Sequence, residues 1–339
     1  MAKPATTKNP VRWGVISTAN IGTQKVIPGM MASGIIDVRA IASRTQPTAR
    51  RWAKKLGIPV AYGSYEDMLN DPEVEAVYNP LPNHLHVPLT LEAAAKGKHV
   101  LCEKPIALSG DEAKTMRGVA RKVHIAEAFM VRCHPQWLKA RDLVQSGRLG
   151  TIRAINTLFS YYNVDPKNVR NMADIGGGAL YDIGCYPIVT ARFLLGAEPV
   201  RCFGLIDRDP KFKTDRTTSA VIDFGKGRHM TFSVSTQATA YQRVQVLGDK
   251  ARLEVEIPFN APQGGAMKLY LDNGKQFADA SAKMIKLPKA DQYQLQGEWF
   301  SRVVRGQEKL TFGLSDAIRQ ARVLDAVFRS AETGQWEKP

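Results

Sequence analysis

The first 130 residues alternate short apolar runs with helix-like segments, and this alternation constrains the fold more than any other feature. The apolar runs predict strands at Val11–Ser17, Ile36–Ser43, Ala76–Asn79, His99–Glu103 and Val123–Phe129. The intervening segments predict helices at Asn20–Ala32, Pro47–Leu56, Ser64–Leu69, His84–Lys96 and Asp111–Lys122. Strands that alternate with helices form βαβ units. We therefore expect residues 1–130 to be an α/β domain with a doubly wound parallel sheet.

After residue 130 the pattern changes to longer strands with fewer helices. Helices are predicted at Pro135–Gln145, Ala179–Leu195, Gln292–Arg305 and Ser315–Glu332. Strands are predicted at Ile152–Tyr162, Val200–Asp207, Thr217–Phe224, His229–Thr236, Gln242–Leu247 and Ala251–Ile257. Turn signals at Gly225–Gly227 and Gly248–Asp249 indicate hairpins. Residues 131–339 are thus expected to be an α+β domain with a large, mainly antiparallel open sheet.

The chain is strongly basic. Its 47 Lys and Arg against 32 Asp and Glu give a formal net charge of +15, which suggests a polyanionic partner. No recognised nucleic-acid motif accompanies the charge, and no stretch approaches the roughly 18 apolar residues of a membrane span. Residues 1–55 carry ten Lys and Arg against Asp37 alone. A phosphorylated dinucleotide is therefore a better explanation than nucleic acid or a membrane.

The N-terminal segment, the cysteines and two histidines predict the compartment and the absence of a metal. Met1–Pro10 lacks the apolar core of a signal peptide, and the four cysteines are far apart in sequence, so we expect a cytoplasmic protein. His84 and His86 have no third ligand at suitable spacing, so no metal is expected.

A candidate dinucleotide turn follows the first predicted strand. The segment Ser17-Thr18-Ala19-Asn20-Ile21-Gly22 stands where G-x-G-x-x-G would be, with small residues in place of two glycines. Ser17, Thr18, Ala19, Asn20 and Ile21 are predicted to bind the cofactor at the start of a helix. A plain strand–turn–helix junction is the alternative.

The end of the second predicted strand indicates which dinucleotide binds. NAD sites commonly place an acidic residue there, whereas this chain has Ser43 and Arg44. A hydroxyl and a guanidinium bind a 2′-phosphate, so the sequence predicts NADP. Arg50, Lys54 and Lys55, which follow, fit the solvated face of a helix.

Three further motifs carry a family resemblance. They are Asn79–His86 (NPLPNHLH), Leu101–Pro105 (LCEKP) and Gly176–Pro187 (GGGALYDIGCYP). Together they resemble the glucose-fructose oxidoreductase and inositol dehydrogenase family (Gfo/Idh/MocA), over essentially the whole chain. Tyr186 stands where many inositol dehydrogenases have His. This resembles the branch of glucose-fructose oxidoreductase, dimeric dihydrodiol dehydrogenases and NADP-dependent xylose dehydrogenases.

The resemblance implies roles for particular residues. Lys104 would lie beside the nicotinamide, with a cis bond into Pro105, and Asp182 and Tyr186 would form the proton-transfer pair. Asn83 is expected to cap a helix. Further cofactor contacts are predicted at Leu81, Asn83, His86, Glu103 and Arg132, the last being equally suited to a structural salt bridge. The resemblance also implies a homodimer formed through the second-domain sheet.

The chemistry of these residue types agrees with that assignment. Oxidation of a sugar hydroxyl removes its proton while hydride leaves the same carbon. Tyrosine, with a pKa of about 10, is a poor base unless an ammonium such as that of Lys104 stabilises its phenolate. The spacing of four places Asp182 and Tyr186 on one helix face, so Asp182 binds a neighbouring sugar hydroxyl or orients Lys104. A solvated lysine and a core tyrosine are the structural alternatives.

The predicted function is an NADP-dependent sugar oxidoreductase that transfers hydride between the anomeric carbon of an aldose and NADP. In one variant, tightly bound NADP(H) is recycled by a second sugar. The alternatives are a ketosugar reductase, for example of 1,5-anhydrofructose, a trans-dihydrodiol dehydrogenase, and a non-catalytic sugar-sensing regulator. Tyr161 and Tyr162 suggest sheet packing or sugar stacking, and the loop Val164–Asp174 is expected to set sugar specificity.

Overall fold

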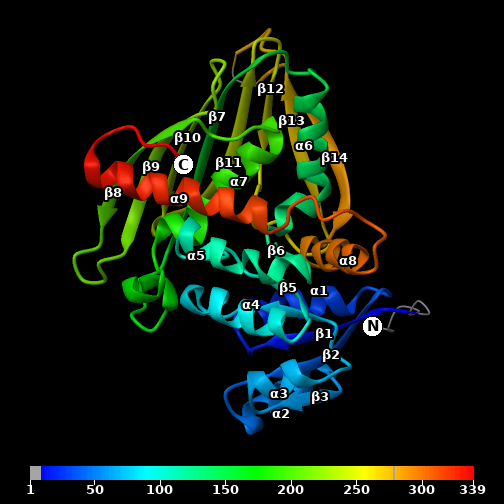
Figure 1. The fold of residues 1–339 in the computed structure, drawn as a ribbon. Helices are drawn as coiled ribbons and strands as arrows, with labels where there is room; N and C mark the ends of the chain where they lie inside the picture. The colour runs from blue at the N-terminus through cyan, green and yellow to red at the C-terminus, as the bar shows by residue number, and fades with distance from the viewer. Residues whose placement is uncertain (1–8, 278) are drawn as a thin grey trace. The chain divides into compact units, whose positions relative to one another are not determined.

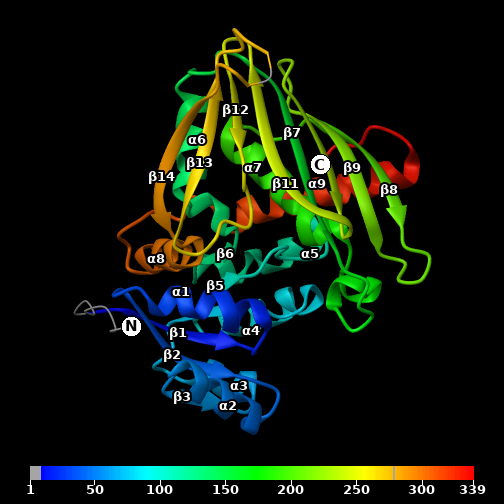
Figure 2. The same cartoon turned by 180° about the vertical axis from the view of Figure 1, so that it is seen from behind.

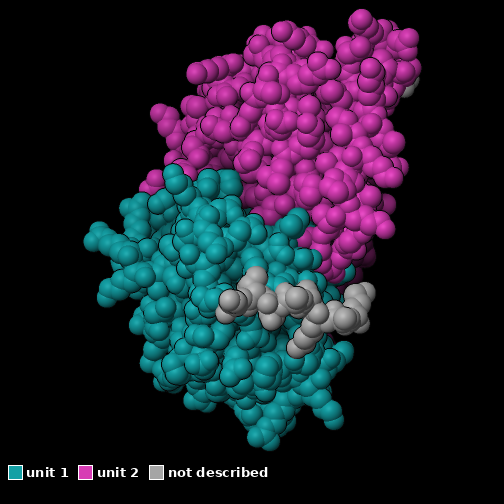
Figure 3. Space-filling view, turned by 90° about the vertical axis from the view of Figure 1, so that its right-hand side faces the viewer, with its two compact units in different colours: residues 1–130, 292–318 teal, residues 131–291, 319–339 magenta. Residues whose placement is uncertain are grey.

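The computed structural model describes residues 9–277 and 279–339, which form two compact units (Figure 3). Unit 1 contains the chain up to residue 130 and residues 292–318, and unit 2 contains residues 131–291 and 319–339. The chain first passes from unit 1 to unit 2 after residue 130. Residues 292–318 differ from the expectation, because they pack with the first unit rather than the second. Of the segment Met1–Pro10, residues 1–8 lie outside the described part of the chain.

Unit 1 is built on a six-stranded parallel sheet in the order β3-β2-β1-β4-β5-β6 (Figures 1 and 2). Its strands are β1 Val11–Ile16, β2 Ile36–Ala42, β3 Val60–Tyr62, β4 Ala76–Asn79, β5 His99–Cys102 and β6 Ile125–Glu127. The three-residue β3 was not predicted. This order reverses between β1 and β4, and dinucleotides bind at such a reversal, beyond the carboxyl ends of the strands.

The helices of unit 1 are mostly short. They are α1 Ile27–Met31, α2 Gln46–Leu56, α3 Tyr65–Asn70, α4 His86–Ala95, α5 Gly110–Lys114 and α8 Gln292–Val304, with the start of α9 Leu314–Thr333. A π-helical turn, Gly22–Val26, precedes α1, so the helix predicted over Asn20–Ala32 is not uniformly α-helical. Such turns are rare and occur often at functional sites.

Close packing explains why α8 belongs to unit 1. The Trp13 indole Nε1 donates to Ser301 Oγ at 3.1 Å, and the Trp13 and Phe300 ring centroids lie 5.6 Å apart. A Cβ added at Gly297 would come within 2.9 Å of side-chain carbons of Met30 and Ile36. Glycine therefore lets α8 lie directly against α1 and β2.

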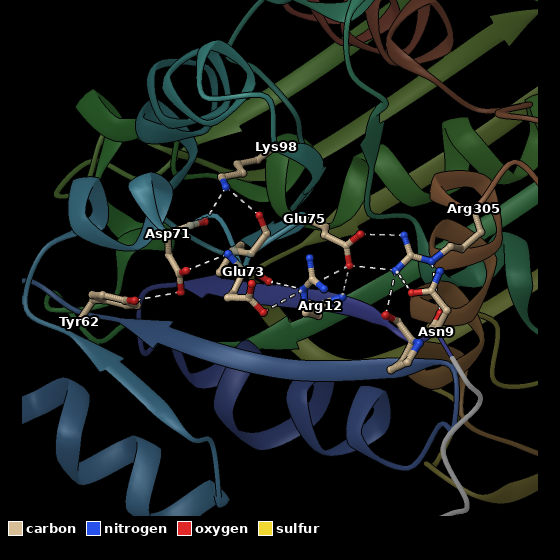
Figure 4. A network of polar contacts seen from close by, with 10 residues as sticks. Asn9, Arg12, Tyr62, Asp71, Glu73, Glu75, Lys98 and Arg305 are labelled. Carbon is tan, nitrogen blue, oxygen red and sulfur yellow. Dashed lines mark hydrogen bonds and ion pairs between the residues drawn. The ribbon is translucent and has the colours of Figure 1, made fainter.

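Arg305, the residue after α8, belongs to a polar network at the edge of the sheet where the strands begin (Figure 4). Arg305 donates to both Glu75 carboxylate oxygens, at 2.8 and 2.9 Å, and to the Pro10 carbonyl at 2.8 Å. These bonds with Arg305 lower the pKa of Glu75. Nearby, the buried Lys98 ammonium donates to the carbonyls of Asp71 and Val74, at 2.6 and 2.7 Å. The charged groups of Lys98 and Arg305 thus form hydrogen bonds within unit 1.

Unit 2 is built on an eight-stranded mixed sheet in the order β14-β13-β12-β11-β7-β10-β9-β8. The strands are β7 Ile152–Tyr162, β8 Arg201–Arg208, β9 Asp215–Asp223, β10 His229–Ser235, β11 Gln237–Gly248, β12 Arg252–Val255, β13 Gly265–Asp272 and β14 Lys283–Ala290. The prediction of a mainly antiparallel sheet is confirmed. One pairing differs from the expected run of hairpins, because β7 lies between β10 and β11 and pairs with β10 in parallel.

The two faces of the unit 2 sheet differ. Helices α6 Pro135–Gln145, α7 Cys185–Leu195 and residues 319–333 of α9 lie on one side, and Figure 2 views the sheet from the other. That other face carries exposed apolar side chains, with Leu205 71% exposed, Leu158 50% and Tyr241 48%. They line a shallow hollow of about 590 Å³, together with Val221 and Arg243.

Candidate active site

The turn after β1 has the geometry of a glycine turn without its first glycine. Ser17 has a φ of +86°, a backbone region that disfavours residues with a Cβ. Its side chain compensates by accepting a hydrogen bond from the Ala19 N–H at 3.3 Å. Thr18, Ala19 and Ile21 are half-buried and Asn20 is exposed. The predicted turn therefore leads directly into a helix N-terminus, which suits a pyrophosphate.

The end of β2 presents one exposed cation. Ser43 is buried, and its N–H donates to the Tyr62 carbonyl at 3.1 Å. Arg44 is exposed, and its charge acts on Tyr65, whose pKa is raised chiefly by burial. A guanidinium that reaches solvent at this strand end suits a 2′-phosphate.

The carboxyl ends of β4, β5 and β6 are cross-linked around Lys104. Tyr78 Oη donates to Glu103 Oε1 at 2.7 Å, and the Ile106 N–H donates to Glu127 Oε1 at 2.9 Å. Between them Lys104 is half-buried, and its bond to Pro105 is cis, as the resemblance implied. The backbone that carries the Lys104 side chain is thus fixed from both neighbouring strands.

His86 lies beneath this segment. The ring is 1% exposed, with Nδ1 2.7 Å from the Pro105 carbonyl oxygen and Nε2 2.7 Å from that of Leu81. Burial lowers the pKa of His86 to about 4, so the ring is neutral and donates to only one carbonyl. The ring has no exposed edge to offer a ribose. The structure therefore gives His86 a supporting position beside Leu81 and Pro105, and its contact with the cofactor stays a prediction.

The remaining predicted cofactor residues lie in different surroundings. Leu81 is buried, and Arg132 is buried just beyond β6. Asn83 begins a single 3₁₀ turn, Asn83–Leu85, whose cap position is Pro82, so the prediction that Asn83 caps a helix is wrong. Proline at that position supplies no side-chain acceptor.

In unit 2, Asp182 is held by two donors that the sequence did not identify. Its Oδ2 accepts from Tyr161 Oη at 2.6 Å and from Arg170 Nε at 2.8 Å. Burial, and then the adjacent carboxylate, raise the pKa of Tyr161 above its ordinary value, so Tyr161 is a proton donor in this contact. The Asp182 charge raises the pKa of Arg170. Asp182 itself lies in a π-helical turn, Leu180–Gly184, that precedes α7.

Tyr186, in the first turn of α7, lies inside an aromatic cluster. Its ring centroid lies 5.4 Å from that of Phe259 and 6.1 Å from that of Phe159, and the residue is 7% exposed. Phe159 and Phe259 in turn lie 4.8 Å apart. Packed rings restrict rotation, so the phenol direction is fixed before any substrate binds.

The glycine run before this helix has a specific steric cause. A Cβ at Gly177 would come within 2.6 Å of the Arg170 and Met172 carbonyl oxygens. The N–H groups of Gly177 and Gly178 donate to those carbonyls, at 2.8 Å to Met172 and 2.9 Å to Arg170. The run therefore allows the loop that carries Arg170 to lie against the start of the Asp182 helix.

Asp215 caps that helix from β9. Its Oδ2 accepts from the Leu180 N–H at 2.6 Å and from Thr218 Oγ1 at 2.7 Å. Burial raises the pKa of Asp215 to about 6. Gly178, at φ +122°, leaves room for this carboxylate. In the described part of the chain, we find no cluster of three or more potential metal ligands and no helix apolar enough to cross a membrane.

Comparisons with known proteins agree with this arrangement. Residues 11–129 match the model of an oxidoreductase family with an NAD-binding Rossmann fold, and residues 137–254 match the GFO/IDH/MocA C-terminal domain. An uncharacterized oxidoreductase of Rhizobium meliloti is 46% identical over 96% of this chain and 98% of its own length. A D-xylose 1-dehydrogenase (NADP(+)) of Haloferax volcanii is 36% identical over 95% and 98%.

A solved structure is similar over the same extent. The 3-ketoreductase KijD10 from Actinomadura kijaniata, crystallised with NADP and TDP-benzene, superposes with a TM-score of 0.88 at 29% identity, over 95% of this chain and 98% of that one. Fold, site and comparisons define a two-unit oxidoreductase with a nicotinamide-dinucleotide domain. The chain belongs to the Gfo/Idh/MocA family.

Proposed function

We propose that this enzyme oxidises an aldose at its anomeric carbon, with NADP as the hydride acceptor. The observation that carries the proposal is the pair of preorganised groups: Lys104, fixed at the end of β5, and Tyr186, fixed among aromatic rings one turn after Asp182. The similarity to a D-xylose 1-dehydrogenase (NADP(+)) supports the choice of an aldose and of NADP.

The residues of unit 1 fit such a cofactor. The turn at Ser17–Ile21 leads into a helix N-terminus, and exposed Arg44 follows β2 without an acidic neighbour that would repel a 2′-phosphate. When bound, the nicotinamide supplies a hydride acceptor. Lys104 would bind beside that ring and polarise the substrate oxygen.

The proton of the sugar hydroxyl would pass to Tyr186 Oη. As hydride leaves C1 the C1–O bond becomes a carbonyl, so the aldose yields a lactone, NADPH and one proton. The Lys104 ammonium would favour the phenolate form of Tyr186 in this step. Asp182, fixed by Tyr161 and Arg170, would bind sugar rather than transfer the proton, since its carboxylate already accepts two hydrogen bonds.

Steady-state oxidation of D-xylose and D-glucose with NADP tests the proposal. Lys104→Met should lower turnover by at least about a hundredfold while NADP affinity is nearly unchanged. Tyr186→Phe should lower turnover most near neutral pH and flatten the pH–rate profile. Wild-type turnover in Lys104→Met, or a pH profile unchanged in Tyr186→Phe, would contradict these roles. A protein that binds sugar but oxidises none would favour the sensing alternative.

A second candidate is reduction of a ketosugar, because the structural similarity to a 3-ketoreductase covers nearly the whole chain. The same Lys104 and Tyr186 serve both directions. NADPH oxidation by 1,5-anhydrofructose, without detectable aldose oxidation, would favour this second candidate. NADP reduction by a trans-dihydrodiol would favour the other alternative, a trans-dihydrodiol dehydrogenase. Cofactor fluorescence of the purified protein tests internal recycling, which requires quenching by one sugar and recovery with another.

The uncovered face of the unit 2 sheet supports a homodimer as part of this proposal. Leu158, Leu205 and Tyr241 expose apolar surface around a hollow, and single proteins rarely leave such a patch in solvent. Sedimentation should give twice the monomer mass, and Leu205→Asp with Leu158→Asp should give the monomer. A monomeric wild type at micromolar concentration would contradict the proposal. The free thiols of all four cysteines fit the predicted cytoplasmic location, which stays a prediction.

A further inference from the structure

Arg170 is the cation of the unit 2 site, and only part of its guanidinium is used within the protein. Its Nε donates to Asp182 Oδ2 at 2.8 Å, and its side chain is 42% exposed. Within residues 9–277 and 279–339, the two outer nitrogens of Arg170 form no hydrogen bond. These nitrogens carry four N–H donors in a rigid plane, so the residue can bind a further oxygen without moving.

The position of Arg170 is fixed by its own backbone. Its N–H donates to Asn168 Oδ1 at 3.1 Å, and its carbonyl accepts from the Gly178 N–H at 2.9 Å. Gly177 lies so close that a Cβ there would collide with the same carbonyl. The backbone of Arg170 is therefore held on both sides, and the Nε bond to Asp182 orients the guanidinium. The Tyr186 phenol is near enough for its charge to act on Arg170.

The charges of this cluster select the kind of group it binds. The Arg170 and Asp182 charges cancel, and Tyr161 stays protonated in its contact with the carboxylate. Taken by itself, this neutral pair lacks the excess of positive charge that binds a carboxylate or phosphate. A neutral hydroxyl suits it better, because one oxygen can accept from the guanidinium and donate to the carboxylate.

We propose that Arg170 is a specificity-determining residue that, with Asp182, binds the hydroxyl on the carbon next to the reacting one. For an aldose oxidised at C1 this is the C2 hydroxyl, whose oxygen accepts from an outer Arg170 nitrogen and whose proton is donated to the Asp182 carboxylate. Asp182 lies one turn before Tyr186 on the same helix, so a group bound by Asp182 is a near neighbour of the one that Tyr186 deprotonates. This inference rests on the proposed aldose oxidation.

The test compares D-glucose with 2-deoxy-D-glucose in four proteins: wild type, Arg170→Ala, Arg170→Lys and a control. The control is Arg201→Ala, which removes another arginine whose Nε donates to an aspartate in unit 2, Asp223, at 3.1 Å. A hydrogen bond to a charged group corresponds to about a ten- to hundredfold preference in kcat/KM for glucose over the deoxy sugar. We expect this preference in the wild type and in Arg201→Ala.

In Arg170→Ala the preference should fall nearly to one, because kcat/KM declines for glucose and little for the deoxy sugar. Arg170→Lys should restore part of it, since an ammonium keeps the charge but not the planar donors. An equal decline for both sugars would show that Arg170 only maintains the loop, and a wild type without a C2 preference would overturn the inference directly. A wild type that oxidises neither of these sugars nor D-xylose overturns the proposed function instead, and this inference with it.

Discussion

His86 Nδ1 lies 2.7 Å from the carbonyl oxygen of Pro105, the residue that directly follows Lys104. The buried ring thus contacts the residue that follows the candidate catalytic lysine, and Glu127 accepts from the N–H of Ile106, the next residue along the chain. The support is made by side chains that themselves have no access to solvent, so it persists whether or not a ligand is bound.

His86→Ala should therefore act on stability and turnover rather than on cofactor choice. Loss of the ring leaves one buried carbonyl without its donor and opens a cavity, so we expect the free energy of unfolding to fall by about 2–4 kcal/mol. Urea unfolding measures this, and kcat should fall with it. A variant of normal stability that binds NADP much more weakly would instead support a direct ribose contact.

Arg44→Ala should distinguish the two dinucleotides. Removal of an exposed guanidinium from a 2′-phosphate should weaken NADP by roughly ten- to a hundredfold and change NAD little. Arg50→Ala, an exposed arginine on α2, serves as the matched control and should change neither affinity. Titration of both cofactors by fluorescence gives the comparison, and equal weakening of NAD and NADP by Arg44→Ala would show that the 2′-phosphate binds elsewhere.

Ser17 allows a test of the strained turn. Glycine adopts a positive φ more readily than serine does. Ser17→Gly is therefore expected to keep or slightly raise the free energy of unfolding and to retain cofactor binding. Ser17→Val places a β-branched residue in the same conformation and should lower the free energy of unfolding by about 1–2 kcal/mol. Thermal unfolding of both variants checks this, and similar melting temperatures would mean that the turn relaxes to a different backbone.

His134 should make the protein sensitive to acid. Its Nδ1 caps α6 by accepting from the Gln136 N–H at 3.2 Å, which requires the neutral ring, and burial lowers the pKa of His134 to about 4. The unfolded chain binds a proton near pH 6.5, so this residue's contribution is complete above pH 6.5 and is lost as the pH falls toward 4.

Between pH 7 and pH 5 we expect His134 to account for a loss of about 1–2 kcal/mol in unfolding free energy. His134→Asn keeps a side-chain acceptor at the cap but does not titrate. Urea unfolding at both pH values should therefore show a smaller difference for this variant than for the wild type. An identical pH dependence in the two proteins would place the acid sensitivity in other groups.

Most strands that are buried on one or both faces were predicted from the sequence, but β13, which is buried on one face, was not. The strand β14 was not predicted because it is an edge strand in which only Leu287 is buried, so it lacks a clear alternation of buried and exposed residues. Its Pro288 has no N–H to donate, a residue tolerated at an edge. The parallel pairing of β7 with β10 escaped for another reason: turn signals report neighbours along the chain, whereas this pairing joins segments about 75 residues apart.

The site also contains residues that the sequence identifies and residues that it does not. Lys104, Asp182 and Tyr186 belong to compact motifs that a single sequence reveals. Arg170 and Tyr161 do not, because they meet Asp182 only when a loop and a strand lie against the same helix. One signal was present in the sequence: three consecutive glycines indicate a close backbone approach, and the approaching segment is the one that carries Arg170.

The return of residues 292–318 to unit 1 has a consequence for biosynthesis. The chain passes between the units after residues 130, 291 and 318, so residues 131–291 of unit 2 lie between the two segments of unit 1 in the sequence. The partners of Trp13 in α8, Phe300 and Ser301, leave the ribosome nearly three hundred residues after it. The nucleotide-binding half must therefore wait, incomplete, until most of the other half has been synthesised, and a fragment that ends at residue 130 would expose the surface that α8 covers.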